Sequence, residues 1–247
     1  FVRPHAPYDA PQYYFDLYKD KDLRPPVKGD WDDTAMLEKR GMVFNSCTGP
    51  KDPELIRQQQ IGYYACITHL DHQIGRIIQA LIEHRLMDNT VILFTSDHGE
   101  MLSDHGWCRK SLPYNGSAHI PMFISGPERY IGPRGRTDDS LVELRDVMPT
   151  LLELAGAKIP AHLDGRSMLH PLDREYIHGE HTFGFNRWSS QFIVTKTDKF
   201  IWLNERNEEQ YFDLVNDPDE THNAIHDPDK QERIAYLRNL LIQELKD

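Results

Sequence analysis

The sequence predicts an α/β layered core followed by a small antiparallel sheet and a terminal helix. Three observations carry this prediction: a long helical pattern in residues 52–85, two short apolar runs after it, and a β-rich segment punctuated by turn residues near the end. We assign the core to residues 1–172 and a small α+β subdomain to residues 173–247.

The first stretch of the chain, residues 1–52, is expected to be rich in loops. Residues 6–52 are rich in Pro, Asp, Lys and Tyr and contain "RPPVKGDWDD". A loop-dominated region of this length is too long for a simple connector, and such loops often cover a site. The chain opens with "FVRPHAPYDAP" and without Met, so we expect a piece of a longer protein in which any targeting segment lies elsewhere.

Residues 53–172 are expected to form the helices and strands of the core. From Asp52 to about Arg85, apolar residues recur at spacings of three, four and seven, as on one face of a helix. These residues are Ile56, Tyr63, Ile67, Leu70, Ile74, Ile77, Ile78 and Leu81. The run "VILFT" then lacks alternation, which predicts a strand buried on both faces. "IPMFISGP" predicts a second strand, and a helix is expected from about Val147 to Leu154, ended by Gly156.

The residue pattern changes from helical and mixed to β-rich after residue 172. "REYIHGEH", "SQFIVTKTDKFIWLN" and "EEQYFDLVND" are β-rich and separated by turn residues, which predicts a small antiparallel sheet. The chain closes with an amphipathic helical pattern. Its apolar stripe consists of Ile234, Leu237, Leu241 and Leu245.

Composition excludes some classes of function. The chain has 39 Asp and Glu against 28 Lys and Arg, a net charge of −11, which argues against a general nucleic-acid binder. A few local cations can still outweigh this charge at an anionic substrate. No apolar run approaches the ~18 residues of a membrane span. The three cysteines form no C-x-x-C pair, so neither a disulfide framework nor a zinc ribbon is expected.

Asp97 and His98 directly follow the run "VILFT". In open α/β sheets, ligands bind beyond the carboxyl ends of strands. A carboxylate beside an imidazole can bind a divalent cation, although two protein ligands are too few for a closed site, so others must come from elsewhere. The alternative is that Asp97 caps a turn and His98 is a histidine of the core.

Three cationic or titratable residues can join this pair. Lys110 lies thirteen residues beyond Asp97, across a loop with glycine, and a lysine near a metal site can hold a tetrahedral oxyanion such as sulfate or phosphate. Arg109 is a weaker candidate of the same kind. His5 lies between two prolines that stiffen its backbone, and it can bind an oxyanion or transfer a proton. The alternatives are a solvated lysine and a histidine that packs a loop.

The order of motifs along the chain resembles a known family. "FVRPHAPY", "THLDHQIGRIIQAL", "DNTVILFTSDHGE", "SDHGWCRK" and "YNGSAHIPMFISGP" are followed by "DVMPTLLELAGAKIP", "LDGRSMLHPL" and "EEQYFDLVNDPDETHN". Together they resemble the C-terminal portion of a type I, formylglycine-dependent sulfatase or arylsulfatase of the alkaline-phosphatase-like superfamily. The resemblance covers nearly the whole chain. It implies a partial alkaline-phosphatase-like α/β/α core and hydrolysis of sulfate esters.

The resemblance also implies roles for single residues. Asp97 and His98 match two ligands of an active-site cation, usually calcium, with His as a variant where many relatives carry Asn. Lys110 matches the lysine that contacts the sulfate. His5 matches the histidine that binds the sulfate or assists breakdown of the sulfated intermediate. His119 stands where relatives often carry Arg, either on the substrate side of the cleft or in a structural role.

Three further residues fall in motifs of the same family. They are Asp71, His105 and Asp146, and we interpret them as structural, through hydrogen bonds at turns and helix starts. We also interpret the second Asp-His-Gly, residues 104–106, as loop architecture that holds Lys110 in place.

Parts of the family pattern are absent from this sequence. The family nucleophile, a formylglycine, is made in a C/S-x-P-S-R motif that does not occur here, and the paired aspartates that complete the cation site are missing as well. We therefore expect the downstream half of a split active site, inactive and weak in calcium binding by itself. An exposed truncated face would favour self-association. The resemblance implies a sulfated small molecule or glycan as substrate and a periplasmic, secreted or lysosomal type of compartment.

Two other functions stay open at this point. A phosphodiester or phosphonate monoester hydrolase of the same superfamily shares the Asp-His-Gly after a strand, although the lysine after the loop favours a sulfatase. A homologue that binds an anionic glycan without turnover is the alternative of a different class. An intact C/S-x-P-S-R motif upstream would support an enzyme.

Overall fold

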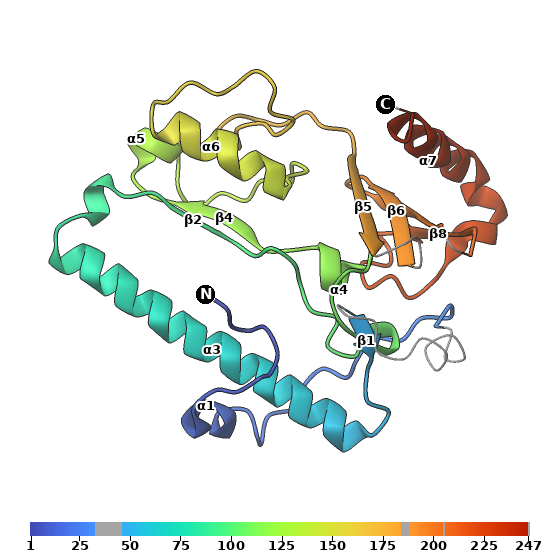
Figure 1. Ribbon diagram of the computed structural model, residues 1–247, viewed down its shortest axis with the longest axis horizontal. Helices are drawn as coiled ribbons and strands as arrows, with labels where there is room; N and C mark the ends of the chain where they lie inside the picture. The colour runs from blue at the N-terminus through green and yellow to red at the C-terminus, as the bar shows by residue number, and fades with distance from the viewer. Residues whose placement is uncertain (33–45, 184–187, 205, 247) are drawn as a thin grey trace.

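The computed structural model describes residues 1–32, 46–183, 188–204 and 206–246 (Figure 1). In this view the two-stranded sheet β2–β4 lies between helix α6 on one side and the long helix α3 on the other. The four-stranded sheet β5–β8 stands beside them and carries the terminal helix α7. The predicted combination of a mixed helix and strand core, a small antiparallel sheet and a terminal helix is confirmed.

The helix predicted from Asp52 is α3, which spans Pro53–Glu83. Asp52 is its N-cap and accepts a hydrogen bond from the Glu54 amide at 2.9 Å, which satisfies one of the free amides of the first turn. Short elements precede and follow it along the chain. They are α1 (Gln12–Asp16), β1 (Ser46–Thr48) and the 3₁₀ helix η1 (Met87–Asn89).

Among the described residues, helix α3 is buried most in its N-terminal half. The Tyr18 hydroxyl lies 2.6 Å from the Thr68 hydroxyl, and the Tyr14 hydroxyl lies 3.1 Å from a ring nitrogen of His72, so the segment around α1 packs on the middle of the helix. The buried residues of α3 all lie in the first half, at Gln60, Gly62, Ala65 and Cys66. In the second half Ile77 remains 51% exposed. The predicted apolar stripe is thus present but only partly buried.

The strands predicted at "VILFT" and "IPMFISGP" are β2 (Ile92–Thr95) and β4 (Met122–Ser125). They pair antiparallel, with Thr95 opposite Met122. The prediction that the first strand is buried on both faces is wrong for the described residues, because every residue of β2 is only partly buried and Phe123 of β4 is 52% exposed. The exposure of Phe123 shows that the described residues leave part of this two-stranded sheet uncovered.

The remaining elements of the core are short. The helix predicted from Val147 is α6, with the predicted bounds Val147–Leu154, and Gly156 follows it with a φ of +67°, a conformation that glycine adopts without strain. The others are η2 (Asp104–Gly106), β3 (Trp107–Arg109), α4 (Asn115–Ala118), α5 (Glu128–Ile131) and η3 (Leu144–Asp146). Strand β3 pairs antiparallel with β1.

The predicted C-terminal sheet is present with the strand order β5-β6-β7-β8, all neighbours antiparallel. Its strands are β5 (Ile177–Phe183), β6 (Trp188–Val194), β7 (Asp198–Leu203) and β8 (Glu208–Asp213). Two 3₁₀ helices, η4 (Ala224–His226) and η5 (Pro228–Lys230), lead from the sheet into the terminal helix. This helix is α7 (Gln231–Glu244).

The C-terminal sheet has a core on each face. On one face, side chains of the sheet pack against Ile234, Leu237 and Leu241 of α7, all of them buried. The fourth residue of the predicted stripe, Leu245, lies beyond the end of α7 and is 46% exposed, so this part of the prediction is wrong. On the other face, Ile201 and Phe212 join a second core with Met101, Trp107 and Tyr114. The loop that contains Lys110 is therefore anchored to the C-terminal sheet.

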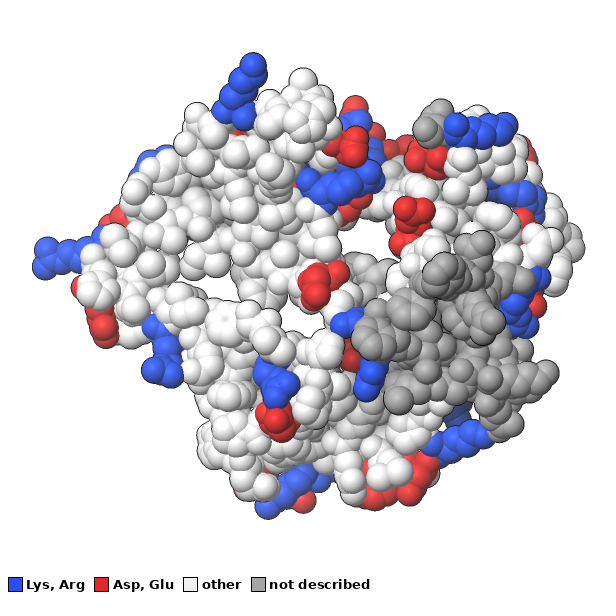
Figure 2. All heavy atoms as spheres, viewed as in Figure 1, with Lys and Arg blue, Asp and Glu red and all other residues white. Residues whose placement is uncertain are grey.

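Within the described residues, no helix combines the length and the hydropathy that a membrane crossing requires. Much of the face over β2 and β4 in Figure 2 is nevertheless free of charged side chains, which gather mostly at its edges.

Candidate active site

Three of the residues singled out in the sequence come together from separate segments. The Lys110 ammonium lies 3.0 Å from Nε2 of His5, although 105 residues separate them along the chain. The ring of His5 lies 6.2 Å from the ring of His98, centroid to centroid, at an interplanar angle of 66°. This cluster lies at the carboxyl end of β2, where the sequence placed the candidate site.

Asp97 and His98 leave their metal-binding atoms accessible. His98 Nδ1 lies 2.8 Å from the Gly99 carbonyl oxygen, which can only accept, so Nδ1 carries the proton and Nε2 of the neutral ring has a free lone pair. That Nε2 lies 3.5 Å from Oδ2 of Asp97. The Asp97 side chain is 84% exposed and the His98 side chain 28%. Both side chains can therefore bind one ion from the same side.

The ring of His5 is held in one orientation by its neighbours. Its Nδ1 donates to the Ala6 carbonyl oxygen at 2.7 Å, which leaves Nε2 as the acceptor for the Lys110 ammonium. Arg3 donates to the His5 carbonyl oxygen at 3.0 Å and also pairs with Asp9. The short segment thus presents an acceptor nitrogen toward Lys110.

Lys110 lies in a loop with an unusual backbone. The residues on both sides of it, Arg109 and Ser111, have a φ of +69° each, and Leu102 and Ser103 at the start of the loop have φ values of +48° and +79°. Residues other than glycine rarely adopt this left-handed region. Such conformations persist where the surrounding structure holds them, and they are concentrated at functional sites.

A close approach of two backbones joins the end of β2 to the segment before β4. The Gly99 amide donates to the Ser117 carbonyl oxygen at 2.8 Å, and a Cβ at Gly99 would lie 2.2 Å from the Gly116 carbonyl oxygen. Only glycine fits at residue 99. His119 follows two residues after Ser117, is exposed, and caps α4 through its amide, which donates to the Asn115 carbonyl oxygen at 3.0 Å.

The second Asp-His-Gly is structural, as predicted. His105 is 3% exposed, with Nδ1 3.1 Å from Asp32 and Nε2 3.2 Å from the Asp219 carbonyl oxygen, and its ring stacks on Trp31. The neighbouring Asp104 accepts a hydrogen bond from the Val27 amide at 2.8 Å, and burial raises its pKa. These contacts fix one end of the loop that contains Lys110.

The other two motif residues differ from each other. Asp146 is fully buried and accepts from the Glu143 and Arg166 amides and from both ends of the Arg174 guanidinium, which is the predicted hydrogen bonding at a helix start. Although burial opposes it, these donors lower the pKa of Asp146. Asp71 instead lies in the middle of α3 and is exposed, so it caps neither a turn nor a helix.

Two residues near the cluster carry no assignment from the sequence. Tyr8 lies three residues after His5, and Glu100 directly follows Gly99. Burial and the nearby Glu100 carboxylate raise the pKa of Tyr8 well above its ordinary value. Burial raises the pKa of the neighbouring Tyr63 to about 12. Tyr8 shares the motif "FVRPHAPY" with His5, and Glu100 shares "DNTVILFTSDHGE" with Asp97 and His98, which is the signal that could have identified them.

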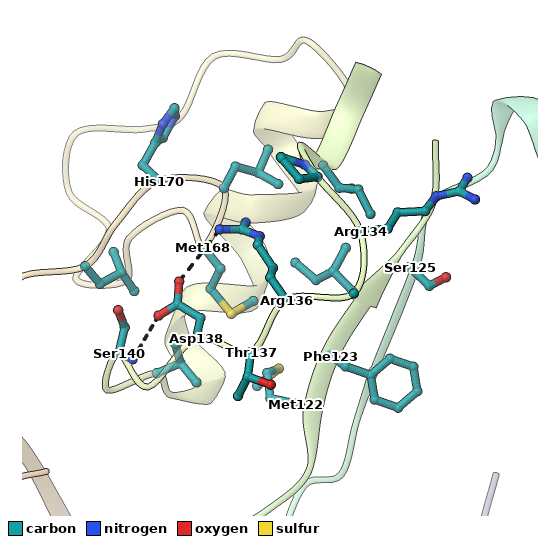
Figure 3. A pocket seen from close by; sticks show the side chains of 17 residues that line it. Met122, Phe123, Ser125, Arg134, Arg136, Thr137, Asp138, Ser140, Met168 and His170 are labelled. Carbon is teal, nitrogen blue, oxygen red and sulfur yellow. Dashed lines mark hydrogen bonds and ion pairs between the residues drawn. The ribbon is translucent and has the colours of Figure 1, made fainter. Parts of the chain in front are cut away.

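A separate cavity of about 450 Å³ lies beside β4 (Figure 3). Its wall includes Arg136, which pairs with Asp138 at 3.9 Å, and Asp138 accepts from the Ser140 amide at 2.9 Å. Met168 and His170 also line it. His5, His98 and Lys110 do not line this cavity, so it is distinct from the cluster.

The donor atoms of Asp97 and His98 fit two positions around a divalent cation, one carboxylate oxygen and one imidazole nitrogen. Among the described residues no group of three or more His, Cys, Asp or Glu side chains is arranged to hold a metal ion. The pair can therefore contribute ligands to a cation site but does not make a closed one.

Comparison with protein families matches the chain in two overlapping parts. A family model described as Sulfatase matches residues 1–157, and one described as N-sulphoglucosamine sulphohydrolase, C-terminal, matches residues 103–247. An arylsulfatase of Clostridium perfringens is 47% identical over 253 residues, which cover 100% of this chain and 52% of the arylsulfatase. The chain thus spans about half the length of this relative.

Solved structures show the same similarity at lower identity. The phosphonate monoester hydrolase of Silicibacter pomeroyi is 27% identical with a TM-score of 0.82, over 99% of this chain and 54% of that enzyme. A protein solved in complex with its substrate D-glucosamine-2-N,6-O-disulfate is 26% identical with a TM-score of 0.71, over 78% of this chain and 41% of that protein.

Proposed function

This chain belongs to the sulfatase family, and we propose that it supplies His5, Asp97, His98 and Lys110 to the active site of a sulfuric ester hydrolase with the alkaline-phosphatase-like fold. One observation carries the proposal. His5 and Lys110 lie 3.0 Å apart beside His98, in a chain that is 47% identical to an arylsulfatase.

Lys110 is proposed to bind the sulfuryl oxygens. Its backbone follows a segment closed by the hydrogen bond from the Met101 amide to the Arg109 carbonyl oxygen, and its ammonium is directed at Nε2 of His5. A charged donor fixed in this way stabilises the negative charge that develops on the oxygens during transfer. Nε2 of His5 accepts from Lys110, and an anionic group that enters between them can take hydrogen bonds from Lys110 and from the protonated ring of His5.

His5 is proposed to bind the oxyanion and to move a proton at its Nε2. Its Nδ1 proton is held by the Ala6 carbonyl oxygen, so proton exchange takes place at the other nitrogen. A histidine that is fixed in this way can donate to an oxyanion when protonated and accept a proton when neutral. His119, exposed at the end of α4, is proposed to line the substrate side.

Asp97 and His98 are proposed to hold a calcium ion. Calcium takes six to eight ligands, mostly oxygens, so the Asp97 carboxylate and the His98 imidazole would supply only part of its shell. A bound cation would neutralise charge on the sulfuryl oxygens. We propose that the nucleophile and the remaining ligands come from sequence outside this chain, since the C/S-x-P-S-R motif does not occur in it.

We propose a sulfated small molecule or glycan as the substrate. The support is the similar protein that was solved with a disulfated glucosamine. The second candidate is a phosphonate monoester hydrolase, because an enzyme of that name is similar over 99% of this chain. The ratio of kcat/KM for an aryl sulfate to that for an aryl phosphonate monoester separates the two, and a sulfatase gives the larger value for the sulfate.

The test uses the complete enzyme, meaning this chain together with the residues that supply the nucleophile. Release of 4-nitrophenol from 4-nitrophenyl sulfate is measured for the wild type and for Lys110→Ala. We expect kcat to fall by about 10²–10³-fold, as for the loss of one fixed donor to a developing oxyanion, with unchanged thermal stability.

Two samples complete the experiment. The exposed Lys158 provides the control, since Lys158→Ala removes a charge without touching the site. This chain alone is expected to show no turnover, because it lacks the nucleophile motif. Near-normal turnover by Lys110→Ala would remove Lys110 from the site, and turnover by the purified chain alone would contradict the split site.

A further inference from the structure

The side chain of Glu100 binds the backbone at both ends of residues 102–109, the loop that leads to Lys110. One of its carboxylate oxygens, Oε1, accepts from the Leu102 amide at 3.1 Å and also from the Arg109 amide. Leu102 opens the loop and Arg109 directly precedes Lys110. One carboxylate oxygen therefore joins both ends, next to the backbone hydrogen bond from the Met101 amide to the Arg109 carbonyl oxygen at 2.9 Å.

The backbone that Glu100 holds is unfavourable by itself. Leu102 and Arg109, whose amides it binds, both have positive φ values, +48° and +69°. The left-handed conformation is unfavourable for residues with a Cβ and persists only where other contacts maintain it. Because Arg109 and Ser111 flank Lys110 in this conformation, the direction of the lysine side chain depends on those contacts.

The same carboxylate also reaches the segment that contains His5. The Tyr8 phenol lies near the Glu100 carboxylate, and burial together with this carboxylate raises the pKa of the phenol. Tyr8 in turn packs on Gly62 of α3, where a Cβ would lie 2.9 Å from the Tyr8 Cβ. Glu100 thus binds the segment before Lys110 and lies near Tyr8 in the segment of His5, and the side chains of these two segments meet at the 3.0 Å contact between Lys110 and His5.

We propose that Glu100 is a positioning residue that fixes Lys110 against His5, with Tyr8 as its partner. The chemical consequence rests on the proposed function, in which Lys110 binds the sulfuryl oxygens. Glu100 acts through the loop, because its Oε1 accepts hydrogen bonds from the Leu102 and Arg109 amides of that loop. Its loss releases the loop end and lets Lys110 move away from His5.

The first experiment needs no catalysis and uses limited trypsin digestion of this chain. Loss of the two hydrogen bonds in Glu100→Ala should speed cleavage after Arg109 and Lys110 by about tenfold, because proteolysis follows the population of the locally open state. Cleavage at exposed sites such as Lys158 should not change. Glu100→Gln keeps an amide oxygen for the two backbone amides and should stay close to the wild type.

Controls separate a local effect from a general one. Glu54→Ala removes an exposed glutamate from the first turn of α3, and Tyr13→Phe removes an exposed phenol, so neither should change cleavage after Lys110. Tyr8→Phe should give a smaller acceleration than Glu100→Ala. Equal acceleration at every site, or none after Arg109 and Lys110, would overturn the proposal.

The second experiment is a double-mutant cycle on kcat/KM in the complete enzyme. Glu100→Ala should lower kcat/KM by about 10²-fold in the wild-type background, as expected for a displaced catalytic group. In the Lys110→Ala background it should change kcat/KM by less than about twofold, because a residue that acts through Lys110 has nothing left to position.

The two experiments can fail separately. If the fold-decreases in kcat/KM caused by Glu100→Ala and by Lys110→Ala multiply in the double variant, Glu100 has a general structural role and the proposal is wrong. If the complete wild-type enzyme hydrolyses no sulfate ester, the proposed function fails, while the digestion pattern still decides whether Glu100 holds the loop.

Discussion

Apolar side chains are buried in the C-terminal sheet but exposed in the region of α3 and β4. Between the sheet and α7, Phe200, Ile234 and Leu237 are completely buried. In the other region, Ile77 of α3 and Phe123 of β4 are each more than half exposed, at 51% and 52%. The sheet has its partner helix within the chain, whereas no described segment covers this side of the other region.

This difference in burial shows which part of the fold anchors the candidate site. The loop with Lys110 is anchored on the second face of the sheet through Met101, Trp107 and Tyr114. A buried ion pair adds to this anchor. Lys199 donates to Glu220 at 2.5 Å, to the Asn115 side chain at 2.7 Å and to the Pro113 carbonyl oxygen at 3.0 Å. The well-packed C-terminal region thus anchors the loop with Lys110.

The largest effect is expected at this ion pair. Lys199→Ala leaves the Glu220 carboxylate buried without its partner, which should cost about 3–5 kcal/mol of unfolding free energy in urea. In Lys199→Met/Glu220→Gln no charge is left unpaired, so this variant should lose less. Lys196→Ala, at an exposed position nearby, serves as the control. A loss below 1 kcal/mol in Lys199→Ala would show that the anchor contributes little.

Apolar truncations test the comparison directly. Leu237→Ala removes a completely buried side chain and should cost about 2–5 kcal/mol, since it leaves a cavity. Ile77→Ala, at a half-exposed position, should stay within about 0.5 kcal/mol in this chain. Urea unfolding of both variants measures the difference. Equal losses of unfolding free energy in the two variants would mean that the α3 region is covered in solution, which would contradict the difference in burial between the two regions.

Self-association is the expected consequence of the open face. Exposed apolar surface on α3 and β4 favours contacts between copies, so light scattering after size exclusion should show the average mass rising with concentration. Ile77→Lys together with Phe123→Lys should shift the protein toward monomer. A clean wild-type monomer at high concentration would show that the exposed residues do not attract a partner.

The smallest effect is an acid sensitivity of the C-terminal region. Hydrogen bonds from Asn216 and Lys230 lower the pKa of Asp213 from 3.8 to about 2. The folded carboxyl has the lower pKa, so its stabilisation is present above pH ~4 and disappears as the pH falls toward 2. Asp213→Asn should cost about 0.2–1 kcal/mol at pH 5 and less at pH 2.5, as expected for a partly exposed pair.

This pH dependence is measured as urea unfolding at the two pH values. A cost for Asp213→Asn that is the same at pH 5 and pH 2.5 would mean that the charge of Asp213 does not stabilise the fold. Asp173→Asn, a carboxylate whose side chain is 94% exposed, provides the control.

The local elements could be predicted from the sequence because each follows from spacing within one segment. The bounds of α6 were correct, and the strands at "VILFT" and "IPMFISGP" are present. Burial could not be predicted in the same way. Leu245 and Ile77 continue apolar patterns yet remain exposed, since burial depends on which segment packs against a residue.

By itself the sequence determined the sulfatase resemblance, the pair Asp97 and His98 at the end of a strand, and Lys110 in the loop after it. Only the tertiary structure brought His5 within 3.0 Å of Lys110, over a separation of 105 residues. It also decided that Glu100 accepts hydrogen bonds from both ends of the loop. Spacing along a chain encodes contacts within one turn or hairpin, whereas contacts between distant segments depend on how the whole chain packs.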